Sequence, residues 1–113
     1  MKIDTVKRWA AMSPEEQWAL ATHLPTIIGP WTDSTYTPGN DCVPAYERLA
    51  VTGRRLGWCR QLPNGRWTWG AGVTPGTPTA TAREAMQRSD ELIRRTREWR
   101  DWTLVGGVPE VTR

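Results

Sequence analysis

The segment Leu56–Ala71 reads LGWCRQLPNGRWTWGA and predicts a β-hairpin. Its centre, Leu62-Pro63-Asn64-Gly65, combines residues that favour a tight turn, and both flanks carry large side chains that favour strands. We therefore expect strands over about residues 56–62 and 66–71, joined by this turn. A further strand is expected from Tyr46 to Thr52, which Gly53 ends, although the residues 47–50 would also tolerate a helix.

The turn allows two pairings of these strands. A three-residue loop, Pro63–Gly65, would form a type I turn with a left-handed glycine. In this pairing, one face of the hairpin would carry the side chains of Cys59, Gln61, Trp67 and Trp69. The opposite face would carry those of Trp58, Arg60 and Leu62. A two-residue Asn64-Gly65 loop would shift the pairing by one residue and bring Trp58, Arg60, Leu62, Trp67 and Trp69 together. The sequence leaves both registers open.

Capping signals predict helices on both sides of the hairpin region. Ser13-Pro14-Glu15-Glu16 is a capping box that begins a helix running to about Leu24, after a first short helix over residues 2–11. Thr81-Ala82-Arg83-Glu84 is a second capping box, and it begins the longest helix, to about Trp102. This helix carries a continuous stripe that we expect to be buried: Ala82, Ala85, Met86, Ser89, Leu92, Ile93 and Thr96. Its other side carries opposite charges at four-residue spacing: Glu84 and Arg88, Asp90 and Arg94, Glu91 and Arg95, Arg97 and Asp101.

These elements predict one α+β domain over residues 1–113. It would comprise two short N-terminal helices (1–24), an irregular loop (25–45), a small antiparallel meander of two or three strands with a long C-terminal helix packed on it (46–105), and a loose tail (106–113). The loop could either pack through Ile27, Ile28, Trp31 and Tyr36 or serve as a mobile functional loop.

The motifs GWxRxLPNGRWxW (residues 57–69) and TxxEAMxxxD (residues 81–90) carry a resemblance. The region 46–102 resembles small tryptophan-rich proteins of bacteriophages and prophages, in which a β-hairpin or three-stranded meander packs on one C-terminal helix. Small phage accessory proteins include inhibitors of bacterial defence such as anti-CRISPRs. The resemblance thus implies a phage protein that acts on a host defence complex.

The composition is unusually rich in tryptophan and arginine. The chain has 8 Trp and no Phe among its 113 residues, so these rings supply much of its large apolar surface. Residues 1–45 hold three bases and five acids, a net charge of −2, whereas residues 46–113 hold twelve bases and seven acids, a net charge of +5. All but two of the bases are arginine, which suits contact with carboxylate or phosphate and stacking on aromatic rings. The basic half therefore favours nucleic acid or an acidic protein surface as its partner.

The candidate partner-binding residues belong to two groups. Five arginines between residues 48 and 66 have no acid among the residues that separate them, and Arg54 and Arg55 at the glycine-flanked corner are the first choice for a partner contact. The irregular loop offers an aromatic ring and acids that would suit a basic channel. The full set is Arg48, Arg54, Arg55, Arg60, Arg66, Trp31, Asp33 and Asp41.

Catalysis is not expected. His23 is the only histidine, and no nucleophile motif, phosphate loop or metal-ligand cluster occurs, so we expect no cofactor and no metal. Cys42 and Cys59 lack metal-ligand spacing and are interpreted as reduced thiols, with a single bridge as the alternative. No stretch has the ~18–20 apolar residues of a membrane span. A location in the host cytoplasm is expected.

Three functions remain open from the sequence, and the third of them is a structural or assembly component of a virion, which would self-associate. The preferred one is a noncatalytic phage or mobile-element accessory protein that binds and inhibits a bacterial defence complex, either protein or ribonucleoprotein, through an aromatic and arginine surface. The alternative is a small DNA- or RNA-binding regulator that uses the arginine-rich hairpin.

Overall fold

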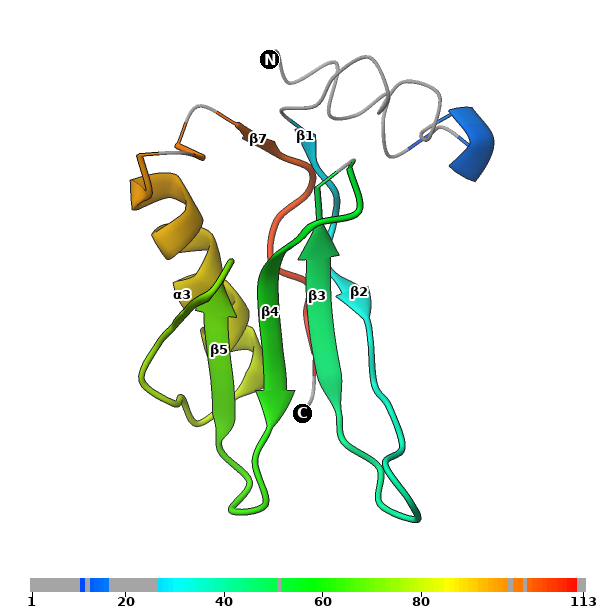
Figure 1. The fold of residues 1–113 in the computed structure, drawn as a ribbon, viewed down its shortest axis with the longest axis vertical. Coiled ribbons are helices and arrows are strands. Elements are labelled where there is room, and N and C mark those ends of the chain that lie inside the picture. The colour runs from blue at the N-terminus through cyan, green and yellow to red at the C-terminus, as the bar shows by residue number, and fades with distance from the viewer. Residues whose placement is uncertain are drawn as a thin grey trace.

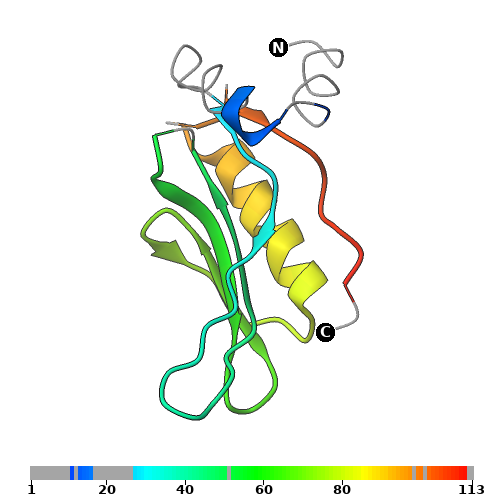
Figure 2. The same ribbon diagram turned by 90° about the vertical axis from the view of Figure 1, so that its right-hand side faces the viewer.

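The computed structural model describes residues 11, 13–16, 27–50, 52–97, 99–100 and 102–111. Over these residues the chain is an α+β structure in which one long helix packs on one face of a five-stranded antiparallel sheet (Figures 1 and 2). The strands lie in the order β2 (Thr32–Asp33), β3 (Ala45–Leu49), β4 (Arg55–Gln61), β5 (Trp67–Ala71) and β6 (Thr74–Pro75), and the helix is α3 (Ala82–Arg95). A separate parallel pair joins β1 (Ile27–Ile28) to β7 (Thr103–Leu104) at one end of the sheet (Figure 1).

The hairpin of β4 and β5 uses the three-residue loop. Gln61 pairs with Trp67 and Cys59 with Trp69, and the amide of Gly65 donates to the carbonyl of Leu62 at 2.9 Å. Gly65 has φ of 83°, a left-handed conformation that glycine adopts without steric cost. Trp67 and Trp69 therefore lie on the face that carries Cys59, and Trp58 lies on the opposite face.

A β-bulge interrupts the pairing of β3 with β4. Arg48 pairs with Gly57, but the next residue, Leu49, pairs with Arg55, so Leu56 is an extra residue on β4. Such an insertion reverses the alternation of side chains along the strand. Leu56 and Gly57 are consequently both buried, and Arg55 lies on the same face as its partner Leu49.

The helix α3 begins where the capping box predicted and ends earlier than expected. The hydroxyl of Thr81 accepts from the amide of Glu84 at 3.2 Å. The helix ends at Arg95, and Thr96 has an extended backbone while its hydroxyl donates to the carbonyl of Leu92 at 2.7 Å. The prediction of a helix to about Trp102 was therefore wrong. The turns after Thr96 return the chain to the sheet, which brings Trp99 into the core.

Two clusters of buried side chains form the core between α3 and the sheet. The first lies over the hairpin end of the sheet: Trp31, Tyr46, Cys59, Trp67, Ala82, Ala85 and Met86. The second lies toward the parallel pair: Ile28, Ala50, Leu56, Ala71, Ile93 and Trp99. The expected stripe on the helix is largely the buried face, with Leu92 partly buried and with Asp90 as an unexpected buried member.

Tryptophan rings lie directly on glycines in this fold. A methyl group added to Gly70 would collide with the ring of Trp58, one on Gly76 with Trp69, and one on Gly72 with Trp99. Two of these rings are also held by hydrogen bonds from Nε1, from Trp58 to the Gly72 carbonyl at 3.0 Å and from Trp69 to the Thr77 carbonyl at 2.7 Å. Glycine removes the side chain that would keep a large flat ring away from the backbone.

Several expectations for the flanking regions can now be compared with the structure. The expected meander of two or three strands is a five-stranded sheet, because residues 25–45 contribute β2, and the segment after the hairpin contributes β6. Ile27, Ile28 and Trp31 are buried, as the packed alternative for the loop required, but its fourth residue, Tyr36, is exposed. The tail, expected to be loose, packs Val108 and Val111 against the first core cluster.

The two predicted N-terminal helices fall almost wholly outside the described residues. Within the described part, Ala11 and Pro14–Glu16 are helical, and the Ser13 hydroxyl accepts from the amide of Glu16 at 3.2 Å, as the capping box predicts. Among the described residues, no helix has the length and apolar character needed to cross a membrane.

Candidate functional site

Two of the predicted contact residues are buried in the core. Arg48 is 0% exposed and Trp31 is 8% exposed, so neither belongs to an exposed contact surface, which corrects the expectation for both. Arg48 points toward α3, where its Nε lies 3.4 Å from Oδ1 of Asp90. The same Oδ1 accepts a hydrogen bond from Nε1 of Trp31 at 3.1 Å, and the Arg48 guanidinium lies 5.1 Å from the centre of the Trp31 ring.

Burial determines the electrostatics of this pair. Desolvation lowers the pKa of Arg48 from its usual value to about 10, although the nearby Asp90 carboxylate opposes the shift. Desolvation likewise raises the pKa of Asp90 above its usual range, against the opposing effects of Arg48 and Trp31. Asp90 was expected to pair with Arg94 on a solvated helix face; it faces the sheet instead and serves as the counter-ion of Arg48. The buried ion pair between Arg48 and Asp90 therefore has a structural role in joining the sheet to α3.

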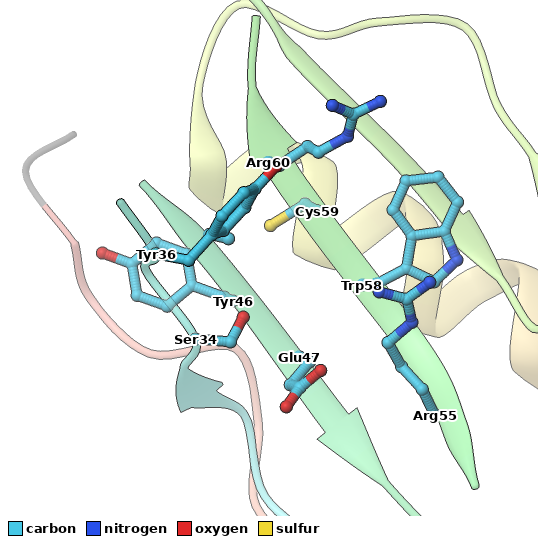
Figure 3. Close-up of a pocket in the computed structure, with 9 residues that line it drawn as sticks. Ser34, Tyr36, Tyr46, Glu47, Arg55, Trp58, Cys59 and Arg60 are labelled. Atoms are coloured by element: carbon cyan, nitrogen blue, oxygen red, sulfur yellow. The ribbon is translucent and has the colours of Figure 1, made fainter. Parts of the chain in front are cut away.

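The open face of the sheet, opposite α3, is the better candidate for a binding surface. Of the elements that the structure describes, none lies over this side (Figure 2). The face carries a hollow of about 470 Å³, shown in Figure 3. Its exposed and half-buried lining combines two arginines, two large aromatic rings and one acid from β3, β4 and the segment after β2: Tyr36, Glu47, Arg55, Trp58 and Arg60.

The Trp58 ring lies flat across this face. The ring covers Gly70 on the neighbouring strand, and the hydrogen bond to the Gly72 carbonyl holds its orientation. The guanidinium of Arg55 lies 5.4 Å from the centre of the ring (Figure 3), a distance typical of a cation–π contact. Trp58 is therefore a fixed aromatic platform with an arginine above it.

Glu47 lies opposite Trp58 on β3, since the two residues are paired across the strands. Within the described part of the chain, its carboxylate forms no hydrogen bond or ion pair, although its backbone carbonyl accepts from Thr32 at 3.2 Å. Tyr36 is 46% exposed and forms an isolated bridge with Val43 beside the hollow. A partner at this face would thus meet an acceptor-only carboxylate on the strand next to Trp58.

A second hollow of about 560 Å³ continues the surface toward the ends of the two hairpins. Tyr36 and Arg60 line both hollows, so they connect the open face to this region. The second hollow is lined further by Asp41, which is exposed in the connection between β2 and β3, and by the turn that contains Pro63. The two hollows therefore adjoin each other and form one elongated surface.

The remaining predicted residues do not converge on the hollows. Arg54 lies over the ring of Trp99 at 5.2 Å, and Arg66, at the hairpin end, donates to the carbonyl of Pro78 at 3.1 Å. Asp33 is exposed on the edge strand β2, where its carboxylate accepts from the amide of Thr35 at 2.8 Å. Of the eight predicted residues, Arg55 and Arg60 line the first hollow, and Arg60 and Asp41 the second.

The described residues offer little support for a catalytic nucleophile or a metal site. Among them, no group of three or more potential ligands is placed to hold a metal ion. Burial raises the pKa of the Cys59 thiol to about 12, so this thiol stays protonated and unreactive. Cys42 is exposed and Cys59 is buried, and both are free thiols in this structure. His23 lies outside the described residues.

Sequence reasoning missed Glu47 and the functional position of Tyr36. Glu47 had an available signal, because it is an acid within a strand whose alternate residues are buried. Tyr36 had no such signal, since only the pairing of its segment with Val43 places it beside β4.

Comparison with models of protein families, with curated proteins and with solved structures gives no match.

Proposed function

We propose that this protein is a noncatalytic accessory protein of a phage or mobile element, and that it binds and inhibits a defence complex in the cytoplasm of its bacterial host. The single observation that carries the proposal is the open face of the sheet, where Arg55, Trp58, Arg60 and Tyr36 are exposed or half-buried around one hollow. Arginine, tryptophan and tyrosine are the residues that dominate binding energy at protein interfaces. The resemblance of residues 46–102 to small tryptophan-rich phage proteins supports the choice of partner.

The proposed mode of inhibition is occupation of a site on the larger complex. A small domain whose contact residues lie on a rigid sheet loses little conformational entropy when it binds. Trp58 is already held by Gly70 and by its hydrogen bond to Gly72, so its orientation need not change. Asp41, at the far end of the elongated surface, would contact basic groups of the same complex.

A phage-plating assay tests this proposal. The protein is expressed in bacterial strains that each carry one active defence system, including CRISPR-type interference, and phage plating is counted. We expect plating to be restored in one of these strains. The Arg55→Ala, Arg60→Ala double variant should lose this effect. The matched control is Arg97→Ala, Arg100→Ala, which removes the same charge from exposed positions after α3. Unchanged defence in every strain, together with no capture of a defence component by the tagged protein, would refute the proposal.

The second candidate function is a small regulator that binds DNA or RNA. It is favoured by one observation, the position of the Arg55 guanidinium over the Trp58 ring beside Arg60, because arginine and aromatic groups together are typical of single-strand binding surfaces. Affinity purification with and without nuclease separates the two functions. Host proteins that remain in stoichiometric amounts after nuclease treatment support the inhibitor, whereas nucleic acid as the main companion supports the regulator.

A further inference from the structure

We infer that the open face binds an unpaired nucleic-acid strand and that Glu47 gives it a preference for cytosine over uracil or thymine. This inference rests on the proposed function, because it takes the open face as the contact surface. The ligand would be, for example, the exposed RNA or the displaced DNA strand of a ribonucleoprotein complex. Three features of the face support it: the spacing of its cations, its aromatic platforms and its single carboxylate.

The bulge in β4 places the two cations on the same face. Arg55 and Arg60 are five positions apart, and in a regular strand they would point to opposite sides. Because Leu56 is an extra residue, Arg55 shares the open side with Trp58 and Arg60. Their partners on β3, Leu49 and Ala45, are four positions apart, so at ~3.3 Å per residue the backbones of the two arginines are roughly 13 Å apart. This spacing allows each guanidinium to contact a different phosphate of one extended strand.

Aromatic groups lie between and beside these cations. Trp58 lies flat on Gly70 with Arg55 over its ring, and Tyr36 is 46% exposed near Arg60. Unpaired bases stack on aromatic rings and on the planes of guanidinium groups, whereas bases within a duplex already stack on each other. The face is therefore suited to a single strand, with one base on Tyr36 and another on the stack of Arg55 and Trp58.

Glu47 supplies the discrimination between bases. Its carboxylate has no partner within the described residues, and it lies across the strands from Trp58. An ionised carboxylate only accepts hydrogen bonds, so it repels phosphate and accepts from an amino group on the edge of a base. Pairing of Glu or Asp with the N4 amino group of cytosine is a known form of base readout. Uracil and thymine present a carbonyl oxygen at this position, which the carboxylate would repel.

Fluorescence anisotropy with the purified full chain tests the inference. The probes are labelled RNA and DNA oligonucleotides of about eight nucleotides, within the ~4–16 nucleotides that one single-strand-binding domain covers. We expect the cytosine strand to bind about 5- to 100-fold more tightly than the uracil or thymine strand, and an oligonucleotide annealed to its complement to bind more weakly than either. With two phosphate contacts, the logarithm of the affinity should fall with the logarithm of the salt concentration with a slope of about −1.4, and of about −0.7 for Arg60→Ala.

Three further variants separate recognition from folding. Tyr36→Ala should weaken binding about 5- to 100-fold, while Tyr36→Phe retains the ring and should bind like the wild type. Glu47→Ala should abolish the preference for cytosine and strengthen binding of the uracil strand, because a negative charge is removed. If Glu47 had only a structural role, its replacement would not strengthen binding of one strand while removing the preference for the other. Arg97→Ala, outside the face, should leave the affinity nearly unchanged.

The outcomes also distinguish this inference from the proposed function. Binding of the single strand with the expected preference supports the inference. Equal binding of single strand and duplex, or a preference unaffected by Glu47→Ala, overturns it. If no oligonucleotide binds at low salt but the protein still captures a defence complex after nuclease treatment, the inference is wrong and the proposed function stands, with a protein surface as the ligand. If neither binds, both are wrong.

Discussion

Replacing Asp90 with asparagine should strongly destabilise the fold. The Asp90 carboxylate is the counter-ion of Arg48, with Oδ1 at 3.4 Å from the guanidinium Nε, and both residues are buried. Asparagine keeps the size and an oxygen that can accept from Trp31, but it removes the charge. Arg48 would then be a buried cation without compensation, and its Nε and Nη1 already have no hydrogen-bond partner.

The expected loss in the free energy of unfolding is about 3–5 kcal/mol, the cost of removing one partner of a buried ion pair. Domains of this size have total stabilities of about 5–15 kcal/mol, so this substitution would remove at least about a fifth of the total, and nearly all of it in a marginally stable domain. With a urea m-value of about 2 kcal/mol/M, the midpoint of unfolding should fall by about 1.5–2.5 M. Urea titration followed by tryptophan fluorescence measures this shift, since the core contains several tryptophan rings.

A double-mutant cycle provides the control. Arg48→Met alone should also be destabilising, because it leaves the Asp90 carboxylate buried without its cation. The double variant Arg48→Met, Asp90→Asn removes both charges, keeps an oxygen that can accept from Trp31, and should be close to the wild type in stability, or above it. A cost below about 1 kcal/mol for Asp90→Asn, the value expected of an exposed pair, would refute the reasoning. So would a double variant whose cost equals the sum of the two single costs.

Three other predictions concern local features. Gly70→Ala should destabilise the protein by about 1–3 kcal/mol, since the added methyl group would collide with Trp58; thermal unfolding measures this, and an unchanged melting temperature would contradict the packing. Thr81→Ala should cost about 1 kcal/mol through loss of the helix cap, whereas Thr81→Ser should retain most of the stability in the same assay. A thiol reagent at pH 8 should modify Cys42 in the native protein and leave Cys59 unmodified until urea is added, because burial raises the pKa of Cys59 to about 12. Rapid reaction of two thiols in the native protein would show that Cys59 is accessible.

Local signals in the sequence determined the hairpin turn and the start of the helix. Pro63, Asn64 and Gly65 favour a type I turn with a left-handed residue, and glycine adopts that conformation at no steric cost, so the position of the turn follows from three adjacent residues. The cap at Thr81 likewise depends only on a residue three positions away. Such features involve neighbours along the chain, which makes them readable from the sequence.

Only the tertiary structure decided which face each arginine occupies. The five arginines look alike in the sequence, yet Arg48 is buried against Asp90 and Arg60 is exposed on the open face. Arg55 joins Arg60 because of the bulge at Leu56, and an insertion of this kind arises from the pairing with β3 rather than from β4 itself.

The end of α3 and the path of Trp99 also depended on tertiary contacts. The helical pattern continues beyond Arg95, but Thr96 ends the helix and Trp99 packs on Gly72, far away in the sequence. The Trp99 ring can pack on this backbone because glycine has no side chain there. The contact joins segments that are distant in the sequence, so the helical pattern alone could not predict it. The sequence by itself therefore determined the local elements, while the contacts between distant segments decided where those elements end and which side chains form the open face.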